Sequence, residues 1–265
     1  MSKKGPIAEW QFYGGSLAGA DIRAKVLAIF PGVLGLAMVP MKYRLVVSLI
    51  LLLGLGAGPA RAELLPDLGT DAVLERPSGK PRGSIILMAG GHGNLGITTD
   101  GQITDLMGNS LIRTRRSFVS GGFATLALSS SGSPSRAIEA MSKIARPVIV
   151  VGTSRAATRM HRALEADGLV ITSGILDEFQ SNVGSSGSLP PTLIVHHRKD
   201  GCRVTSPELV APFINWAAGR ARVVWVDGGR DEGDPCQARG HHGFAGVEGR
   251  MVGAVLGFAR SVRAR

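Results

Sequence analysis

The sequence contains no block of Lys and Arg residues with interleaved aromatic side chains, although its formal net charge is +10. Residues 1–62 hold 7 Lys and Arg residues and 2 Asp and Glu residues. The remaining residues hold 23 Lys and Arg and 18 Asp and Glu, a net charge of +5 that is scattered along the chain. This pattern does not favour nucleic-acid binding. With 44% hydrophobic residues, the composition also excludes disorder, collagen and coiled coil.

One apolar run in the N-terminal quarter of the chain is shorter than the roughly 20 residues that a membrane-spanning helix needs. It covers residues 45–58, follows Lys42 and Arg44, and precedes the small residues Ala60 and Ala62. Basic residues, a short apolar run and small residues at the cleavage position are, in this order, typical of a secretory signal peptide. We therefore predict cleavage after Ala62.

The chain is accordingly divided into three segments. Residues 1–40 are expected to be an upstream extension, residues 41–62 the signal peptide, and residues 63–265 one mature domain in the periplasm or secreted. An uncleaved anchor is the alternative, supported by a second apolar stretch at residues 26–39, and only then would the protein contact a membrane.

Six apolar, β-rich runs alternate with helix-like stretches in the mature chain. The runs are continuous rather than alternating, which is typical of strands buried on both faces, so we predict an α/β fold. The expected architecture is a mostly parallel sheet with helices on both faces, a three-layer sandwich. The expected strands are 84–89, 122–129, 147–152, 169–173, 192–197 and 221–228, and the expected helices are 110–120, 135–145, 154–166, 206–219 and 245–265.

Ser154 lies where the expected strand 147–152 runs directly into a helix, within the sequence Gly-Thr-Ser-Arg-Ala. A nucleophilic Ser needs this geometry, because a sharp turn lifts its hydroxyl above the sheet and small neighbours avoid collisions. The N–H of Arg155 would then start a helix, where free donors can stabilise an oxyanion. The alternative is a Ser that caps the helix. Ala156 also stands where the common pattern has Gly.

Two further residue types follow in order at later strand ends. Asp200 comes just after the strand 192–197, and His242 lies in the last long loop before the C-terminal helix. Ser, Asp and His in this order are typical of α/β-hydrolases. The mature chain resembles a small, capless member of that superfamily, and the run at 87–96 resembles the oxyanion loop after its third strand.

This resemblance implies a role for each residue. Ser154 would be the nucleophile, His242 the general base and then acid, and Asp200 the carboxylate that orients the imidazole. Gly91 or His92 would supply an oxyanion N–H beside that of Arg155.

Several alternatives remain open at this stage. Asp200 lies in a polar turn and is a candidate for an ordinary surface residue, with Asp177 and Asp234 as rivals for the acid. His241 competes with His242, which is favoured because Gly243 and an aromatic residue follow it.

Neither a metal nor another cofactor is expected. Five of the six histidines fall in or beside expected strand ends, but adjacent histidines on extended backbone point to opposite faces, and neither H-E-x-x-H nor C-x-x-C occurs. A zinc site would need three or four converging ligands.

The only two cysteines fall in the loops that carry Asp200 and His242. In an exported protein they should be oxidised. If the strands ending at 197 and 228 are neighbours, Cys202 and Cys236 leave adjacent strand ends and could form a disulfide. Two free buried thiols are the alternative.

The sequence thus predicts an exported serine hydrolase that acts on a small ester. A thioester, amide or lactone substrate is an alternative, as is a non-catalytic binding protein on the same scaffold, because a fold does not fix a function. The pocket is expected to be formed by residues 93–109, 177–191 and 229–241.

Overall fold

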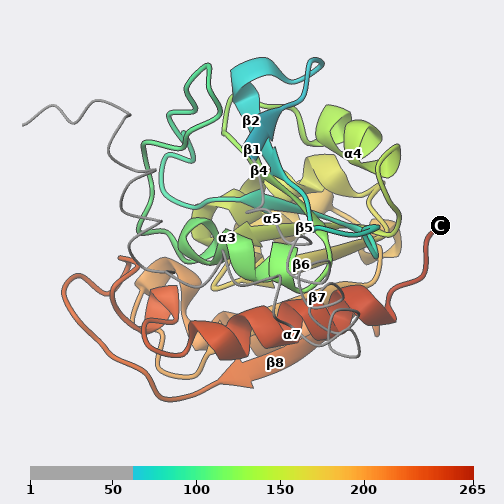
Figure 1. Cartoon of the computed structure of the whole chain (residues 1–265). Helices are drawn as coiled ribbons and strands as arrows, with labels where there is room; N and C mark the ends of the chain where they lie inside the picture. Colours follow the sequence, from blue (N-terminus) through green and yellow to red (C-terminus); the bar gives the residue numbers. More distant parts are fainter. Residues whose placement is uncertain (1–61) are drawn as a thin grey trace, which may run out of the picture. The chain divides into compact units, whose positions relative to one another are not determined.

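The computed structural model describes residues 62–265, so the expected extension and nearly all of the expected signal peptide lie outside the described residues. This part of the chain forms an eight-stranded sheet in the order β1-β2-β4-β3-β5-β6-β7-β8 (Figure 1). The strands are β1 (Ala62–Leu64), β2 (Ala72–Glu75), β3 (Ser84–Met88), β4 (Ala124–Leu128), β5 (Val148–Thr153), β6 (Gly168–Thr172), β7 (Thr192–His197) and β8 (Ala221–Val226).

Strands β3 to β8 are the six that the sequence predicts, and each boundary falls within two residues of the expected one. Their neighbours in the sheet pair in parallel, for example Ile85 with Ile149 and Val150 with Leu169. The sequence did not predict β1 and β2, which add two antiparallel strands at one edge. The three-layer α/β fold is therefore confirmed, with an antiparallel addition.

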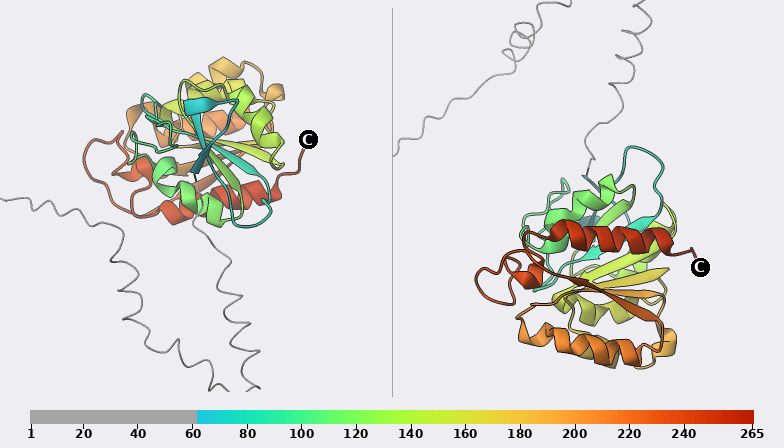
Figure 2. Two further views of the ribbon diagram at one scale, coloured as in Figure 1. Left: turned by 45° about the horizontal axis from the view of Figure 1, so that its top comes forward. Right: turned by 90° about the horizontal axis from the view of Figure 1, so that it is seen from below.

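Helices cover both faces of the sheet (Figure 2). They are α3 (Ser110–Ser120), α4 (Pro134–Ser142), the 3₁₀ helix η3 (Ser154–Ala163), α5 (Leu176–Val183), the short η6 (Pro207–Leu209) followed by α6 (Val210–Trp216), and α7 (Glu248–Ser261). One apolar cluster joins α3 and α7 to one face, and another joins α4, η3, α5 and α6 to the opposite face. Successive strand residues alternate between these clusters, so Ile85 packs with α7 and Ile86 with α4.

Polar side chains cap the first turns of two of these helices. Asn109 caps α3 by accepting a hydrogen bond from the N–H of Leu111, and Ser133 caps α4 by accepting from the N–H of Arg136. Helix α5 lies in a segment that the sequence analysis treated as a pocket loop. Among the described residues no helix is both long and apolar enough to span a membrane.

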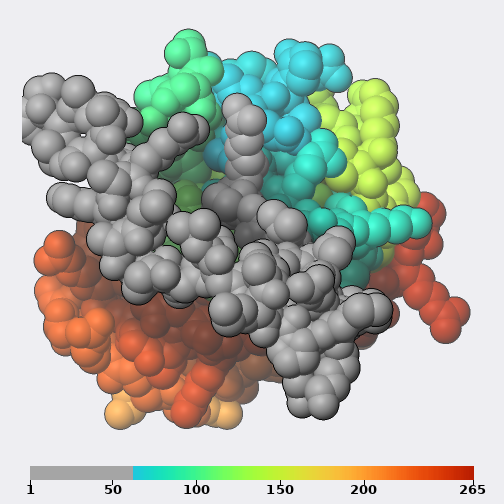
Figure 3. All heavy atoms as spheres, in the orientation of Figure 1, coloured from blue at the N-terminus to red at the C-terminus, as the bar shows by residue number. Residues whose placement is uncertain are grey.

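The parallel strands end at a common edge of the sheet, and the segments that follow them meet there. Gly90 and Gly91 follow β3, Ser154 follows β5, Asp200 follows β7, and His242 lies beyond β8. In the space-filling view, the cyan segments around β2 lie at the top and the segments coloured orange lie at the lower left (Figure 3).

Candidate active site

Ser154 occupies a strained turn at the end of β5. Its φ is +54°, which lies in the left-handed region that a residue with a side chain seldom adopts. The N-cap of η3 is Thr153, which makes no side-chain capping hydrogen bond. A capping Ser would have extended backbone and would bind an N–H of the first turn. Ser154 is therefore not the helix cap that the alternative interpretation required.

Small residues surround this turn because other segments approach it closely. An added Cβ at Gly152 would lie 2.4 Å from the Met160 sulfur, and one at Gly90 would lie 2.8 Å from the Ser154 Cβ. Ala156, which replaces the usual Gly, is 1% exposed and packs in the core without disrupting the turn. The departure from the common pattern is thus accommodated.

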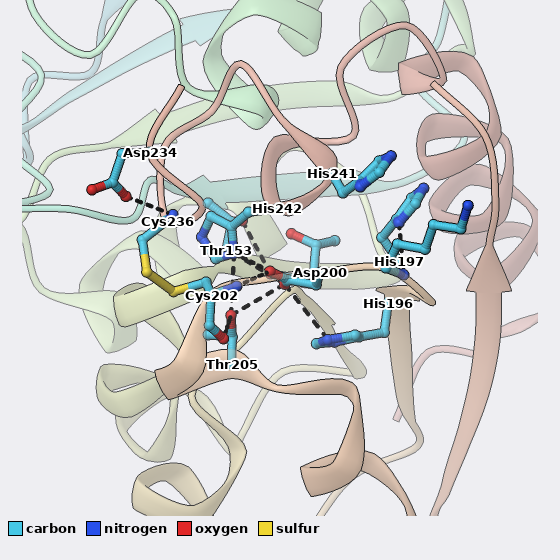
Figure 4. A network of polar contacts seen from close by, with 12 residues as sticks. Thr153, His196, His197, Asp200, Cys202, Thr205, Asp234, Cys236, His241 and His242 are labelled. Atoms are coloured by element: carbon cyan, nitrogen blue, oxygen red, sulfur yellow. Dashed lines mark hydrogen bonds and ion pairs between the residues drawn. A yellow bond between two sulfur atoms is a disulfide. The ribbon is translucent and has the colours of Figure 1, made fainter. Parts of the chain in front are cut away.

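Asp200 is buried beside β7 and accepts several hydrogen bonds. Its carboxylate accepts the backbone N–H of Cys202 at 3.0 Å and the hydroxyl of Thr205 at 3.1 Å. The His242 Nδ1 lies 3.0 Å from Oδ2 (Figure 4). A carboxylate with this many donors is held in one orientation. The structure therefore excludes a surface position for Asp200.

His242 is nearly buried and faces Asp200 rather than solvent. Because Asp200 accepts from Nδ1–H, the neutral imidazole carries its lone pair on Nε2, the atom that a general base uses. Ser154 and His242 line the same cavity. Among the described residues no hydrogen bond joins Ser154 Oγ to His242, and such contacts are often long in proteins without bound substrate.

The rival residues do not form an Asp–His pair with Asp200 or His242. His241 stacks on His197 with 4.2 Å between ring centroids (Figure 4), and its Nδ1 lies 3.5 Å from the Asp231 carboxylate. Asp177 is exposed on α5, and Asp234 accepts the N–H of Cys236. Of the two candidate histidines, His242 lines the Ser154 cavity and pairs with a buried carboxylate, that of Asp200.

Two further histidines surround this pair without facing the cavity. His196 is fully buried 3.6 Å from the Asp200 carboxylate, and its two ring nitrogens have no hydrogen-bond partner among the described residues. Burial lowers the pKa of His196 to about 4, although Asp200 opposes this shift. Burial also lowers the pKa of His197, whose Nε2 lies 2.8 Å from the Gly228 carbonyl oxygen. Both imidazoles are thus neutral at pH 7.

The cavity beside Ser154 has a volume of about 650 Å³. Its walls come from the segment after β3, the Ser154 turn and the loop before His242; the residues are Gly90, Gly91, Leu106, Gly108, Asn109, Ser110, Thr153, Ser154, Arg155, Ile175, Cys202, Val204, Glu232, Gly233, Asp234, Cys236, Gln237, Ala238, Arg239, His242 and Gly243. The prediction that residues 177–191 line the cavity was wrong. That segment forms α5, and its Leu176 and Phe179 pack into the core instead.

The two alternatives for the oxyanion donor beside Arg155, Gly91 and His92, differ in position. Gly91 and Arg155 both line the cavity, and the Gly91 N–H makes no hydrogen bond to a described residue. His92 does not line the cavity, and its exposed ring contacts Asp105 and the N–H of Asn94. The geometry therefore favours Gly91 over His92 as the second donor.

Cys202 and Cys236 form a disulfide with a Cα–Cα distance of 4.6 Å. Both residues border the cavity, so the bridge connects the Asp200 segment to the loop that leads to His242. The alternative of two free thiols is thus excluded in this structure. Within residues 62–265, no group of three or more His, Cys, Asp or Glu side chains converges as metal ligands would.

Three residues near the site, Thr205, His196 and Arg113, were not predicted from the sequence to contribute to it. Thr205 Oγ1 lies 3.1 Å from both the Asp200 carboxylate and His242 Nδ1. Its position five residues after Asp200 was a weak local signal. Arg113 donates to carbonyl oxygens on both sides of His242 from a helix more than 100 residues away, which no sequence pattern indicates.

A scan against protein-family models and a search of curated proteins find no match for this chain. Solved structures with similar folds are found. A dienelactone hydrolase from Anabaena variabilis aligns with a TM-score of 0.54 at 12% identity over 78% of this chain and 100% of its own. An alpha-beta serine hydrolase homologue from Coxiella burnetii (16% identity) and Est1E from Butyrivibrio proteoclasticus (12%) each align with a TM-score of 0.51 over 76% of this chain and 97% of theirs.

The described part of the chain has the fold of the α/β-hydrolase superfamily.

Proposed function

We propose that this protein is a serine hydrolase that cleaves a small ester through an acyl-serine intermediate. The observation that carries the proposal is the pairing of buried Asp200 with His242 Nδ1 at the wall of a cavity that also contains the strained Ser154. A base oriented by a carboxylate next to a Ser on a sharp turn is the arrangement that acyl transfer needs.

In the first half of the reaction, His242 Nε2 takes the proton from the Ser154 hydroxyl as Oγ attacks the ester carbonyl carbon. The carbonyl oxygen becomes an oxyanion, which the N–H groups of Gly91 and Arg155 stabilise by donating hydrogen bonds. The bond to the alcohol then breaks, and the imidazolium of His242 gives its proton to the departing oxygen. Ser154 is left acylated.

In the second half, His242 takes a proton from a water molecule, and the hydroxide oxygen attacks the acyl carbon. The second tetrahedral intermediate collapses, the proton returns to Ser154 Oγ, and the carboxylic acid leaves. Asp200 stabilises the imidazolium in both halves and keeps Nε2 directed toward the cavity. No cofactor takes part in this sequence.

The proposal includes export to the periplasm or beyond. The signal-like segment at residues 41–62 supports it, and the Cys202–Cys236 disulfide is of the kind that persists in oxidising compartments. Sequencing the N-terminus of the protein recovered from a bacterial periplasm tests this part. The expected first residue is Glu63, whereas a membrane-bound form that retains residues 45–58 would contradict cleavage.

The enzymatic part is tested by treating the protein with a fluorophosphonate probe and measuring its intact mass. One adduct on Ser154 is expected. Ser154→Ala should abolish the adduct and lower kcat on a short-chain aryl ester by about 10³-fold or more, with the fold retained. Absence of labelling in the wild-type protein would favour a non-catalytic binding protein, and preferential turnover of thioesters or amides would change the substrate class.

A further inference from the structure

Arg113 is a partly buried side chain near the start of α3 that the reaction described above does not use. Its guanidinium lies between two segments that border the cavity. Nη2 donates to the Gly243 carbonyl oxygen at 2.6 Å, and Nη1 donates to the Ala238 carbonyl oxygen at 3.2 Å and to that of Gly108. All three acceptor residues line the cavity, whereas Arg113 itself does not.

Glu248, in the first turn of α7, holds the guanidinium in place. Its Oε1 accepts from Arg113 Nη2 at 2.9 Å and from Nε at 3.2 Å. Burial raises the pKa of Glu248, but hydrogen bonds from its own N–H, from Arg113 and from the Gly246 N–H together lower it below the usual range. The carboxylate is therefore charged at neutral pH and fixes the planar guanidinium toward the three carbonyl groups.

The turn that carries His242 lies between two of these acceptors. Ala238 precedes His242, Gly243 follows it, and the two backbones approach so closely that a Cβ at Gly243 would lie 2.2 Å from the Ala238 oxygen. Arg113 therefore joins both ends of this turn and, through Gly108, connects it to the opposite wall after β3. Only Arg has enough donors in one plane for these acceptors and Glu248 together.

The other hydrogen bonds of the loop before His242 lie mostly near its start, where the carbonyl oxygens of Asp227 and Gly228 contact Arg250 and His197. Residues 227–240 contain neither helix nor strand, and the side chains from Gly228 to Gln237 are exposed. Cys236, which lies six residues before His242, joins the loop to Cys202 through the disulfide. Between that disulfide and the imidazole, the hydrogen bonds from Arg113 are the contacts that fix the backbone of the turn to the helical layer.

We propose that Arg113 is a positioning residue for His242, which aligns Nε2 with Ser154 by fixing the backbone on both sides of the imidazole. The inference rests on the proposed function, because His242 must act as the base. A displacement of about 1 Å in a catalytic group can lower the rate by about 10²-fold. Substrate binding should change much less, since Arg113 does not border the cavity.

The test compares Arg113→Ala, Arg113→Lys and the matched control Arg116→Ala in the full chain. Arg116 lies one turn further along α3, is exposed and approaches only Glu75. Removing Arg113 should lower kcat on an aryl ester by about 10²-fold with KM changed less than about threefold. Arg113→Lys should lower kcat nearly as much, because an ammonium group cannot replace the several donors that the planar guanidinium holds in one plane. Arg116→Ala should keep the wild-type kcat.

Rescue distinguishes positioning from general support of the fold. Adding millimolar guanidinium should restore part of the kcat of Arg113→Ala and leave Arg113→Lys and Arg116→Ala unchanged. Equal kcat in Arg113→Ala and Arg116→Ala would overturn the inference. The inference would also be overturned if the kcat of Arg113→Lys fell only in proportion to its unfolded fraction, measured by circular dichroism. This comparison decides the inference if Arg113→Ala does not fold.

A readout independent of turnover separates this inference from the proposed function. The proton on His242 Nδ1, shared with Asp200, should give a slowly exchanging NMR signal that broadens or is lost in Arg113→Ala and persists in Arg116→Ala. If the wild-type protein does not react with a fluorophosphonate, the proposed hydrolase fails while this signal still reports whether Arg113 orders the imidazole. An unchanged signal in Arg113→Ala would overturn the positioning role.

Discussion

The two sides of the candidate site are held in different ways. Ser154 and Asp200 follow buried parallel strands, so pairing along β5 and β7 sets their positions. His242 lies in a long, mostly exposed loop, and individual contacts set its position: the hydrogen bond to Asp200, the disulfide at Cys236 and the bonds from Arg113. Substitutions in the strands should therefore act on the whole fold, and substitutions in the loop should act mainly on the base.

The strongest test of this difference is within the loop itself. His242→Ala should lower kcat by about 10³-fold, about as much as Ser154→Ala, because the two residues act as a unit. His241→Ala should lower it less than about 10-fold, because His241 contacts His197 and Asp231 rather than Asp200. Steady-state kinetics on one aryl ester measures both. An inactive His241→Ala with an active His242→Ala would assign the base to the other ring.

Removal of the disulfide should test how much the loop contributes to stability. Cys202 and Cys236 are 34 residues apart, and by the loop-entropy model the double change to Ser should lower the free energy of unfolding by about 3 to 4 kcal/mol. Urea unfolding of wild type and double variant, followed by fluorescence, gives the difference. Coincident unfolding curves, or alkylation of both cysteines in unreduced wild-type protein, would contradict this prediction.

The close approach within the His242 turn gives a smaller, local effect. Gly243→Ala should displace the turn, because the new Cβ would lie 2.2 Å from the Ala238 oxygen, and kcat should fall by about 10²-fold. Gly249→Ala is a suitable control, since a Cβ there meets no atom within 4 Å. A kcat for Gly243→Ala equal to that of Gly249→Ala would show that the turn tolerates the shift.

On the strand side, the smallest expected effect is a dependence of stability on pH. The folded pKa of His196, about 4, is below the reference value of 6.5, so the unfolded chain binds more protons between these values. The stability contribution of neutral His196 is present above about pH 6.5 and is lost as the pH falls toward 4. Between pH 7 and pH 5 this amounts to about 2 kcal/mol.

Urea unfolding at pH 7 and pH 5 measures this loss. His196→Gln should remove about 2 kcal/mol of the difference between the two pH values. His161→Gln, at a partly exposed position on η3, should leave the difference unchanged. The same pH dependence in all three proteins would assign it to other groups.

The central sheet could be predicted from the sequence because each strand is a continuous apolar run buried on both faces. β1 and β2 could not, since they are three and four residues long and lie at an edge. Helix α5 was missed because its eight residues are largely polar, with only Leu176 and Phe179 buried. The segment 154–166 was expected to be an α-helix and forms a shorter 3₁₀ helix that ends at Ala163.

The residues of the candidate site likewise include some that could be predicted from the sequence and some that could not. Ser154, Asp200 and His242 were identifiable because their order along the chain places each one beyond a strand. Arg113 and His196 were not, since their roles depend on contacts that the order of the chain does not encode, such as the pair between Arg113 and Glu248. Residues 177–191 were misassigned to the pocket because a polar segment with Gly and Pro is equally typical of a loop at either end of the sheet.

The contact between Arg113 and Glu248 joins residues 135 positions apart in the chain. Contacts of such high sequence separation close a large loop, and folding rates decrease as they come to dominate a structure. The turn that carries His242 depends on this contact and on a helix at the C-terminal end. A chain that ends before α7 contains Ser154, Asp200 and His242 but lacks both Glu248 and the α7 residues that pack against α3. If Arg113 has the proposed role, the His242 turn reaches its final position only after this last segment has folded.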